Sequence, residues 1–148
     1  MRFLSVSLFA LSILLFSCKN GSTGPMQKAA EMSDLPKDFL DFYQQFHTDS
    51  AYQIAHIEWP LKGEKTVPGD NGIDKKVLAT WEPENWAIQH LPDLVSSGLK
   101  RSFETSSEVL VIEHLQYPMV NYGMERQFYK DENNEWRMIY YTEMQDLR

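Results

Sequence analysis

The sequence predicts an α+β fold, in which N-terminal helices pack on a strongly curved antiparallel sheet. Two observations predict this class. Aromatic residues recur at helical spacing near residue 40, and the last third of the chain is rich in β-branched and aromatic residues that alternate with polar ones. Helices followed by a run of strands are typical of α+β proteins rather than of repeated βαβ units.

The first helix is expected within residues 34–49, DLPKDFLDFYQQFHTD. Four aromatic side chains occupy positions i, i+3, i+4 and i+7, which lie on one helix face: Phe39, Phe42, Tyr43 and Phe46. Ser33 or Asp34 is expected to cap the helix, and Pro36 is tolerated in its first turn. Because aromatic side chains bury large areas, this face needs a broad partner such as a sheet.

The middle of the chain predicts a short helix at 50–54, capped by Asp49. Residues 57–61 then alternate as a strand. Since Pro60 has no N–H to donate, this strand is expected at a sheet edge or to carry a bulge. Four further segments are expected in order: a turn-rich loop at 63–74, a returning strand at 75–81, a helical turn at 82–86 and a short strand at 87–91.

The C-terminal third predicts an antiparallel meander. Three segments have the composition of strands: 108–117, 119–130 and 135–144. The sequence DENN at 131–134 suits a hairpin turn between the last two.

The start of the chain predicts a lipoprotein signal peptide at residues 1–17. Arg2 supplies a positive charge, and residues 3–16 are apolar except for three serines. This apolar run is shorter than the roughly 18–20 residues of a membrane-spanning helix, and it lacks the polar face of a surface helix. It ends in LFSC, which resembles the bacterial lipobox, so Cys18 is expected to be acylated and to become the new N-terminus. Cys18 is the single cysteine, which excludes an intrachain disulfide.

The mature chain is expected to consist of the lipidated Cys18, a flexible linker at 18–33 and one domain at 34–148. The linker, KNGSTGPMQKAAEMS after Cys18, is rich in small and polar residues. Loss of the signal peptide leaves 13 basic and 21 acidic side chains, a net charge of −8. This charge argues against nucleic-acid binding and against adhesion to anionic lipid, so the Cys18 lipid is expected to provide the membrane attachment.

A set of spaced residues resembles a known family. The set comprises Phe39, Phe42, Phe46, Asp49, Tyr52, Gln53, Ile57, Trp59, Pro60, Leu61 and Gly63, with the later Trp81, Trp86 and FYKDENNEWRM at 128–138. Over about residues 36–144 the chain is similar to a domain of unknown function found in lipoproteins of Bacteroides-type bacteria. This resemblance implies a cone of the nuclear transport factor two-like kind, a fold that serves isomerases, dehydratases and many non-catalytic binding domains. The fold alone does not choose among these functions, and no catalytic residues carry over.

The residues after Cys18 bear on its location. In lipoproteins of Bacteroides-type bacteria, acidic residues just after the cysteine resemble a surface-export signal. Residues 19–22 are instead KNGS. We therefore expect a cell-envelope lipoprotein in the outer membrane that faces the periplasm.

Arg126 is the most informative polar residue. On an alternating strand it shares a face with Tyr122, Met124 and Phe128, and a charge on an apolar face needs a partner. One interpretation is a guanidinium at a pocket mouth that holds a ligand carboxylate in bidentate fashion. The alternatives are an internal ion pair with an acid such as Glu113 and a side chain that extends to the end of the sheet.

Three further residues complete the expected ligand site. Tyr122 shares the face of Arg126, His114 could donate to a ligand, and Trp59 could line a pocket. The alternatives are that His114 is simply buried or exposed to solvent, and that Trp59 is a residue of the hydrophobic core.

The leading hypothesis is a non-enzymatic binding protein for a small apolar or anionic ligand or for an envelope protein. The alternative is an isomerase- or dehydratase-like enzyme, with Asp49, Tyr122 and His114 as the proton-transferring groups. That activity needs an acid or histidine inside the domain within hydrogen-bond reach of a tyrosine. A structural homodimer that pairs through an exposed sheet face is a third possibility. No metal and no cofactor are expected, because the four histidines lack HxH or HxxxH spacing and the chain has no glycine-rich phosphate loop.

Overall fold

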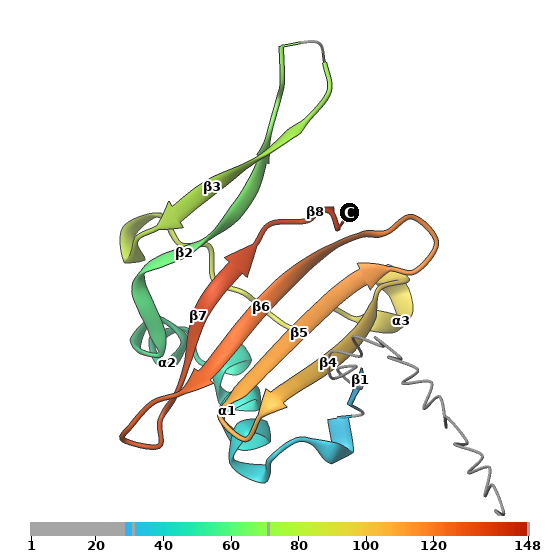
Figure 1. Cartoon of the computed structure of the whole chain (residues 1–148). Helices are drawn as coiled ribbons and strands as arrows, with labels where there is room; N and C mark the ends of the chain where they lie inside the picture. Colours follow the sequence, from blue (N-terminus) through green and yellow to red (C-terminus); the bar gives the residue numbers. More distant parts are fainter. Residues whose placement is uncertain (1–28, 31, 71, 148) are drawn as a thin grey trace, which may run out of the picture.

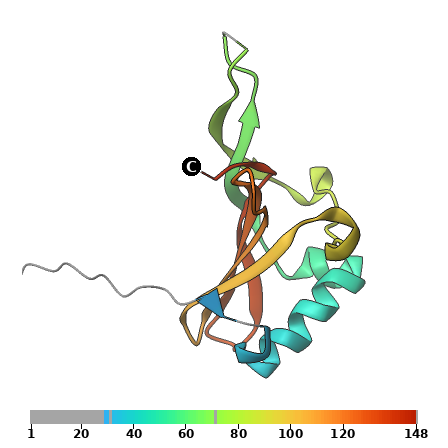
Figure 2. The same cartoon turned by 90° about the vertical axis from the view of Figure 1, so that its right-hand side faces the viewer.

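The computed structural model describes residues 29–30, 32–70 and 72–147 (Figure 1). The expected signal peptide, Cys18 and nearly all of the linker lie outside the described residues. Helices lie on one face of a large sheet, and a long hairpin extends beyond the rest of the sheet (Figures 1 and 2). Within the described part of the chain, no helix has both the length and the apolar character needed to span a membrane.

Two α-helices follow each other near the start of the domain, as expected. Helix α1 (Lys37–Thr48) follows a 3₁₀ turn, η1 (Met32–Asp34), and helix α2 is Ser50–Ala55. The Asp49 carboxylate caps α2, because it accepts hydrogen bonds from the N–H groups of Ala51 (2.9 Å) and Tyr52 (3.0 Å). The expected cap of α1 is wrong: its N-cap is Pro36, and no side chain caps it, since Asp34 belongs to η1.

The sheet has the strand order β1-β4-β5-β6-β7-β2-β3, and a short strand β8 pairs with β6. The strands are β1 (Ala29–Ala30), β2 (Ile57–Val67), β3 (Lys75–Trp81), β4 (Lys100–Ser107), β5 (Leu110–Tyr117), β6 (Tyr122–Lys130), β7 (Trp136–Thr142) and β8 (Gln145–Asp146). The meander of β5, β6 and β7 is antiparallel, as predicted. Figure 2 shows the sheet bending toward the helices along β4. The α+β class with a curved sheet is therefore confirmed.

Strand β2 differs from the expectation in two ways. It pairs with β7 in parallel, so the sheet is mixed rather than wholly antiparallel. It also continues to Val67 and forms a long hairpin with β3, where a loop from residue 63 was expected. Pro60 follows a cis peptide bond, and the pairing register shifts between Ile57 and Lys62, which confirms the expected bulge.

Gly63 explains how β2 can approach β7 so closely. A Cβ atom added at Gly63 would stand 1.6 Å from the carbonyl oxygen of Tyr141. Any larger residue would therefore push β2 off its parallel partner, and only glycine allows this approach.

The segment between β3 and β5 was predicted least well. The helical turn at 82–86 is present as η2 (Pro83–Asn85), but residues 87–91 form no strand. A short helix, α3 (Leu94–Ser97), follows, capped by the side chain of Asp93. Strand β4 was not expected at all, because KRSFETSS is polar and has one buried apolar residue, Phe103.

The aromatic face of α1 packs on the concave side of the sheet. Phe39 is fully buried, and its ring centroid lies 5.0 Å from that of Trp136 and 5.6 Å from that of Phe128. Phe46 is also fully buried against Phe128, at 5.7 Å. These contacts join α1 to β6 and β7, so residues about 90 positions apart in the chain form one core.

Replacement of Phe39 by alanine is expected to lower the free energy of unfolding by about 3–5 kcal/mol, because it leaves a cavity among aromatic rings. Denaturant unfolding followed by tryptophan fluorescence would measure the change. Tyr129→Ala is the matched control: Tyr129 lies on β6 but is 39% exposed, and its removal should cost much less. Equal effects of the two substitutions would contradict this account of the core.

Candidate functional site

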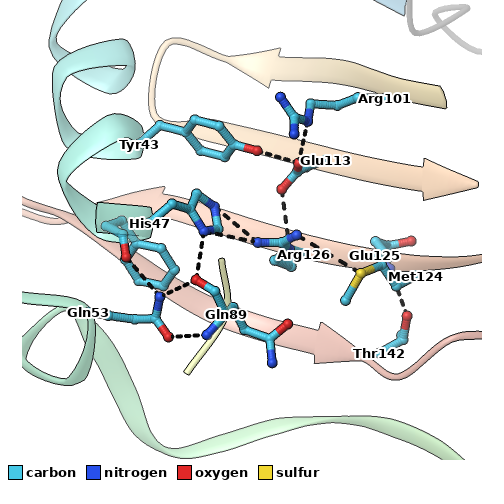
Figure 3. Close-up of polar contacts among 11 residues, drawn as sticks. Tyr43, His47, Gln53, Gln89, Arg101, Glu113, Met124, Glu125, Arg126 and Thr142 are labelled. Atoms are coloured by element: carbon cyan, nitrogen blue, oxygen red, sulfur yellow. Dashed lines mark hydrogen bonds and ion pairs between the residues drawn. The ribbon is translucent and has the colours of Figure 1, made fainter. Parts of the chain in front are cut away.

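Five polar side chains meet between α1 and the sheet, and we call them the buried ion cluster. They are Tyr43, His47, Arg101, Glu113 and Arg126 (Figure 3). Glu113 and Arg126 are each 1% exposed, and His47 is 4% exposed. So many ionisable groups in a core are unusual, because burial of a charge is costly unless it is paired.

Strand register brings the charged members together. Glu113 of β5 stands directly opposite Arg126 of β6 and opposite Phe103 of β4. Arg101 precedes Phe103 by two residues, so it projects from the same face of β4 and is a diagonal neighbour of Glu113. The carboxylate therefore lies between two guanidinium groups carried by the two flanking strands.

Helix α1 contributes the two remaining members of the cluster. Tyr43 and His47 are four residues apart, so both side chains leave the helix toward the sheet. The Tyr43 hydroxyl donates a short hydrogen bond to Glu113 Oε1. Burial, together with the negative charge of Glu113, raises the pKa of Tyr43 well above its ordinary value. Tyr43 is thus held as a neutral donor.

The two arginines interact with Glu113 as close ion pairs rather than through well-aligned hydrogen bonds. Arg101 Nε lies 3.1 Å from Glu113 Oε1, and Arg126 Nε lies 3.3 Å from Glu113 Oε2. Neither Nε atom, nor Oε2, has a hydrogen-bond partner of good geometry among the described residues. The guanidinium groups therefore keep hydrogen-bonding capacity that Glu113 does not use.

His47 is a neutral member of the cluster. Its Nε2 atom lies 3.0 Å from Arg126 Nη1, and its Nδ1 atom lies 3.0 Å from the carbonyl oxygen of Gln89. These partners assign the proton to Nδ1, so Nε2 accepts from the guanidinium. Burial, and then the positive charge of Arg126, lower the pKa of His47 to about 3.

Gln53 of α2 fixes the loop that carries Gln89. Its amide nitrogen donates to the carbonyl oxygens of Phe46 (2.7 Å) and Gln89 (2.8 Å). Its amide oxygen accepts from Trp86 Nε1 (2.9 Å) and from the Gln89 N–H (2.8 Å). Gln53 is fully buried, so these four bonds satisfy all of its polar atoms and hold residues 86–89 beneath the helices.

An open pocket adjoins the buried ion cluster, and we call it the Arg101 pocket. Its volume is about 420 Å³, and its lining includes Met32, Leu40, Tyr43, Gln44, Leu91 and Arg101. Tyr43 and Arg101 belong to both the pocket and the cluster. The guanidinium carbon of Arg101 lies 5.7 Å from the centre of the Tyr43 ring, a cation–π contact. The pocket therefore reaches the charged interior through these two side chains.

A second cavity, of about 340 Å³, lies between α1, α2 and the β6–β7 turn. Its carboxylates are already paired: Asp38 contacts Lys130 at 2.6 Å, Asp41 contacts Lys37 at 2.6 Å, and Glu135 contacts Arg137 at 2.8 Å. It is the poorer candidate for a site because its charges have partners.

The expected ligand residues do not form one site. Arg126 is buried in the cluster, where it makes the expected ion pair with Glu113 rather than standing at a pocket mouth. Tyr122 is 42% exposed at the start of β6. His114 projects from the opposite face of β5, with Glu104 at 3.6 Å and Glu125 at 3.8 Å. Trp59 packs edge-on against Trp86 at 6.0 Å and donates from Nε1 to the Ile54 carbonyl.

The residues of the alternative enzyme are also separated. Asp49 caps α2 at the surface, Tyr122 is at a strand end, and His114 is on the outer sheet face. The pairing that such an enzyme needs, an acid within reach of a tyrosine, is instead made by Glu113 and Tyr43. Among the described residues, no group of three potential ligands could hold a metal ion.

Sequence reasoning missed Tyr43, His47 and Arg101 as site residues. The spacing of Tyr43 and His47 on the aromatic face of α1 was a usable signal, since it places two polar groups toward the core. Arg101 gave no such signal, because β4 itself was not recognised.

Solved structures of similar fold include two proteins from Bacteroides. One is a nuclear transport factor two-like protein from Bacteroides fragilis, with a TM-score of 0.52 and 18% identity over 76% of this chain and 48% of that one. The other is a cystatin-like protein from Bacteroides caccae, with a TM-score of 0.51 and 17% identity over 70% of this chain and 74% of that one. The chain therefore spans about half the length of the first structure. No protein-family model matches the chain, and no curated protein does.

These similarities, at such low identity, concern the fold. They support the cone of helices on a curved sheet that the sequence predicted, in the nuclear transport factor two-like class. This fold hosts both binding proteins and enzymes, so the function has to be argued from the residues of the site.

Glu113→Gln is expected to lower the free energy of unfolding by about 3–5 kcal/mol, because it leaves two buried guanidinium groups without a counter-charge. Chemical denaturation at neutral pH would measure the loss. Asp41→Asn is the control, since it breaks an exposed pair with Lys37 and should cost no more than about 0.5 kcal/mol. A Glu113→Gln loss as small as that of the control would contradict the charge balance.

The free energy of unfolding of the wild type is expected to fall as pH falls below about 6.5. In the unfolded chain His47 becomes protonated near this pH, whereas in the folded chain its pKa is about 3, so it stays neutral. The unfolded state then binds more protons, so this single group should cost about 2 kcal/mol between pH 7 and pH 5. His47→Gln keeps an acceptor and a donor but should lose this dependence.

Thermal or denaturant unfolding at a series of pH values would measure the effect. Identical profiles for the wild type and His47→Gln would show that His47 is not held neutral in the fold.

Proposed function

We propose that this chain is a non-enzymatic lipoprotein of the cell envelope whose cone-like domain binds a small ligand or a protein partner. The LFSC segment supports acylation of Cys18, and the apolar residues before it support a signal peptide. The sequence KNGS after Cys18 supports an outer-membrane location that faces the periplasm. The Bacteroides origin of both similar structures agrees with the resemblance to Bacteroides-type lipoproteins.

One observation carries the binding function: the Arg101 pocket opens onto a cluster whose charges are not balanced. Glu113 offers one negative charge, Arg101 and Arg126 offer two positive charges, and His47 is neutral. The excess positive charge lies beside a pocket that is large enough for a small molecule, since such sites measure about 300–1,000 Å³.

The same geometry argues against proton-transfer catalysis. Glu113 is the single buried acid beside a tyrosine in the described residues, and it is held by Tyr43, Arg101 and Arg126 at once. A general base must instead reach a substrate proton. Glu113 is 1% exposed and lies behind Tyr43 and Arg101, which serve as the boundary of the pocket. We therefore favour binding over the isomerase- or dehydratase-like alternative.

Native mass spectrometry of the mature protein, purified from the envelope of its host, tests the binding function. A bound small molecule of constant mass is the expected result. If the chain carries no bound molecule but crosslinking in cells captures envelope proteins, the partner is a protein rather than a small ligand. A chain with neither would contradict the proposed function.

Acylation is expected to depend on Cys18. The wild type should incorporate labelled palmitate in its host, and Cys18→Ser should incorporate none, because serine lacks the thiol that is modified. Ser22→Ala, in the linker, is the control and should be labelled like the wild type. Label on Cys18→Ser, or an unlabelled wild type, would refute the lipid anchor.

A further inference from the structure

We propose that the Arg101 pocket binds a small organic acid, with the ligand carboxylate against Arg101 and its apolar body between Leu40 and Leu91. This proposal rests on the binding function above and names the class of ligand. It concerns a different arginine from the one that the sequence suggested, because Arg126 is enclosed and Arg101 lines the pocket.

Arg101 is largely buried and also lines the pocket, as expected for a residue that binds an anion. Its side chain is 10% exposed, so it is nine-tenths buried and yet forms part of the pocket lining. Its Nε atom lies 3.1 Å from Glu113 Oε1 but has no hydrogen-bond partner of good geometry among the described residues. Figure 3 shows the Arg101 guanidinium beside Glu113, with the ion pair made through its Nε atom. A guanidinium has five donors, so Arg101 keeps donors for a ligand.

Arg101 is also held in place before any ligand arrives. Its guanidinium stacks near the Tyr43 ring at 5.7 Å, and the Tyr43 hydroxyl is fixed by its bond to Glu113. Such restraint lowers the conformational entropy that binding would cost. The carboxylate of Glu113 orients Arg101 without neutralising the whole cluster.

The charge count selects a monoanion. Arg101, Arg126, Glu113 and neutral His47 sum to one positive charge. One carboxylate would make the cluster neutral, whereas a cation would be repelled. A phosphate-like dianion would bring one more negative charge than the cluster can balance, so it is matched less well than a monoanion.

The apolar side chains that line the pocket favour an acid with an apolar body. Met32 and Leu91 are 41% and 40% exposed, so two large apolar side chains meet water at the pocket. Leu40 lines it from α1, and Gln44 adds a polar group. Burial of these apolar surfaces by a ligand is favourable, while the amide of Gln44 could bind a second polar group.

Titration of the purified mature chain with hexanoate, followed by ligand-detected NMR or calorimetry, tests the proposal. Hexanamide, which has the same body without the charge, and hexylamine, which has the opposite charge, are the matched probes. We expect hexanoate to bind at least about tenfold more tightly than either, because the hydrogen bonds from a guanidinium to a carboxylate are charge-assisted.

Substitutions at the pocket wall separate charge from folding. Leu91→Glu should weaken hexanoate binding by about tenfold or more, and Leu91→Lys should bind it more tightly than Leu91→Glu does. Val95→Glu is the control: Val95 is 95% exposed on α3 and does not line the pocket, so hexanoate should bind as it does to the wild type. Arg101→Gln should abolish binding, with folding checked by circular dichroism.

Two results would overturn the proposal: no preference for hexanoate over hexanamide, or equal hexanoate binding by Leu91→Glu and Val95→Glu. A neutral or cationic molecule found by native mass spectrometry in the envelope-purified protein would also overturn it. That result would leave the broader binding function standing, whereas an empty chain without partners would remove both.

Discussion

The buried carboxylate of Glu113 is the interaction on which the rest of the domain depends. It connects β4 through Arg101, β6 through Arg126 and α1 through Tyr43. An ion of either sign is costly inside a core, so each of these groups requires the others to be in register. The cluster therefore favours one arrangement of three strands and a helix over other packings of the same apolar surfaces. This is a role in specificity rather than a large net gain in stability.

Aromatic packing supplies the stability that the ion cluster does not. Phe39 and Phe46 are fully buried against β6 and β7, and a second group of rings brings together Trp59, Trp81, Trp86 and Tyr141. The first group places α1 over the sheet, so it also positions Tyr43 and His47. The hydrophobic core thus determines the geometry at which the polar groups meet.

The division between a closed cluster and an open pocket shapes the functional argument. The buried acid and tyrosine, Glu113 and Tyr43, are hydrogen-bonded to each other, while the unbalanced positive charge lies at the pocket boundary, at Arg101. A binding site formed in this way uses a structural feature, the diagonal pairing of Arg101 and Glu113, for recognition. The proposed lipid anchor and the proposed ligand site are separate, one at Cys18 and the other in the domain.

The sequence by itself determined the local structure: the two helices, the Asp49 cap, the bulge at Pro60 and the C-terminal meander follow from spacing and turn chemistry among near neighbours. It also indicated that Arg126 needs a partner and suggested Glu113. Only the tertiary structure decided that β2 runs parallel to β7, that polar β4 joins the sheet, and that Arg101 and Tyr43 share a carboxylate. These depend on register between strands far apart in the chain, which composition does not encode. The predicted ligand site was wrong for the same reason. Alternation along a strand tells which face His114 or Tyr122 shares with its neighbours on that strand, but not which residues of other strands lie beside it.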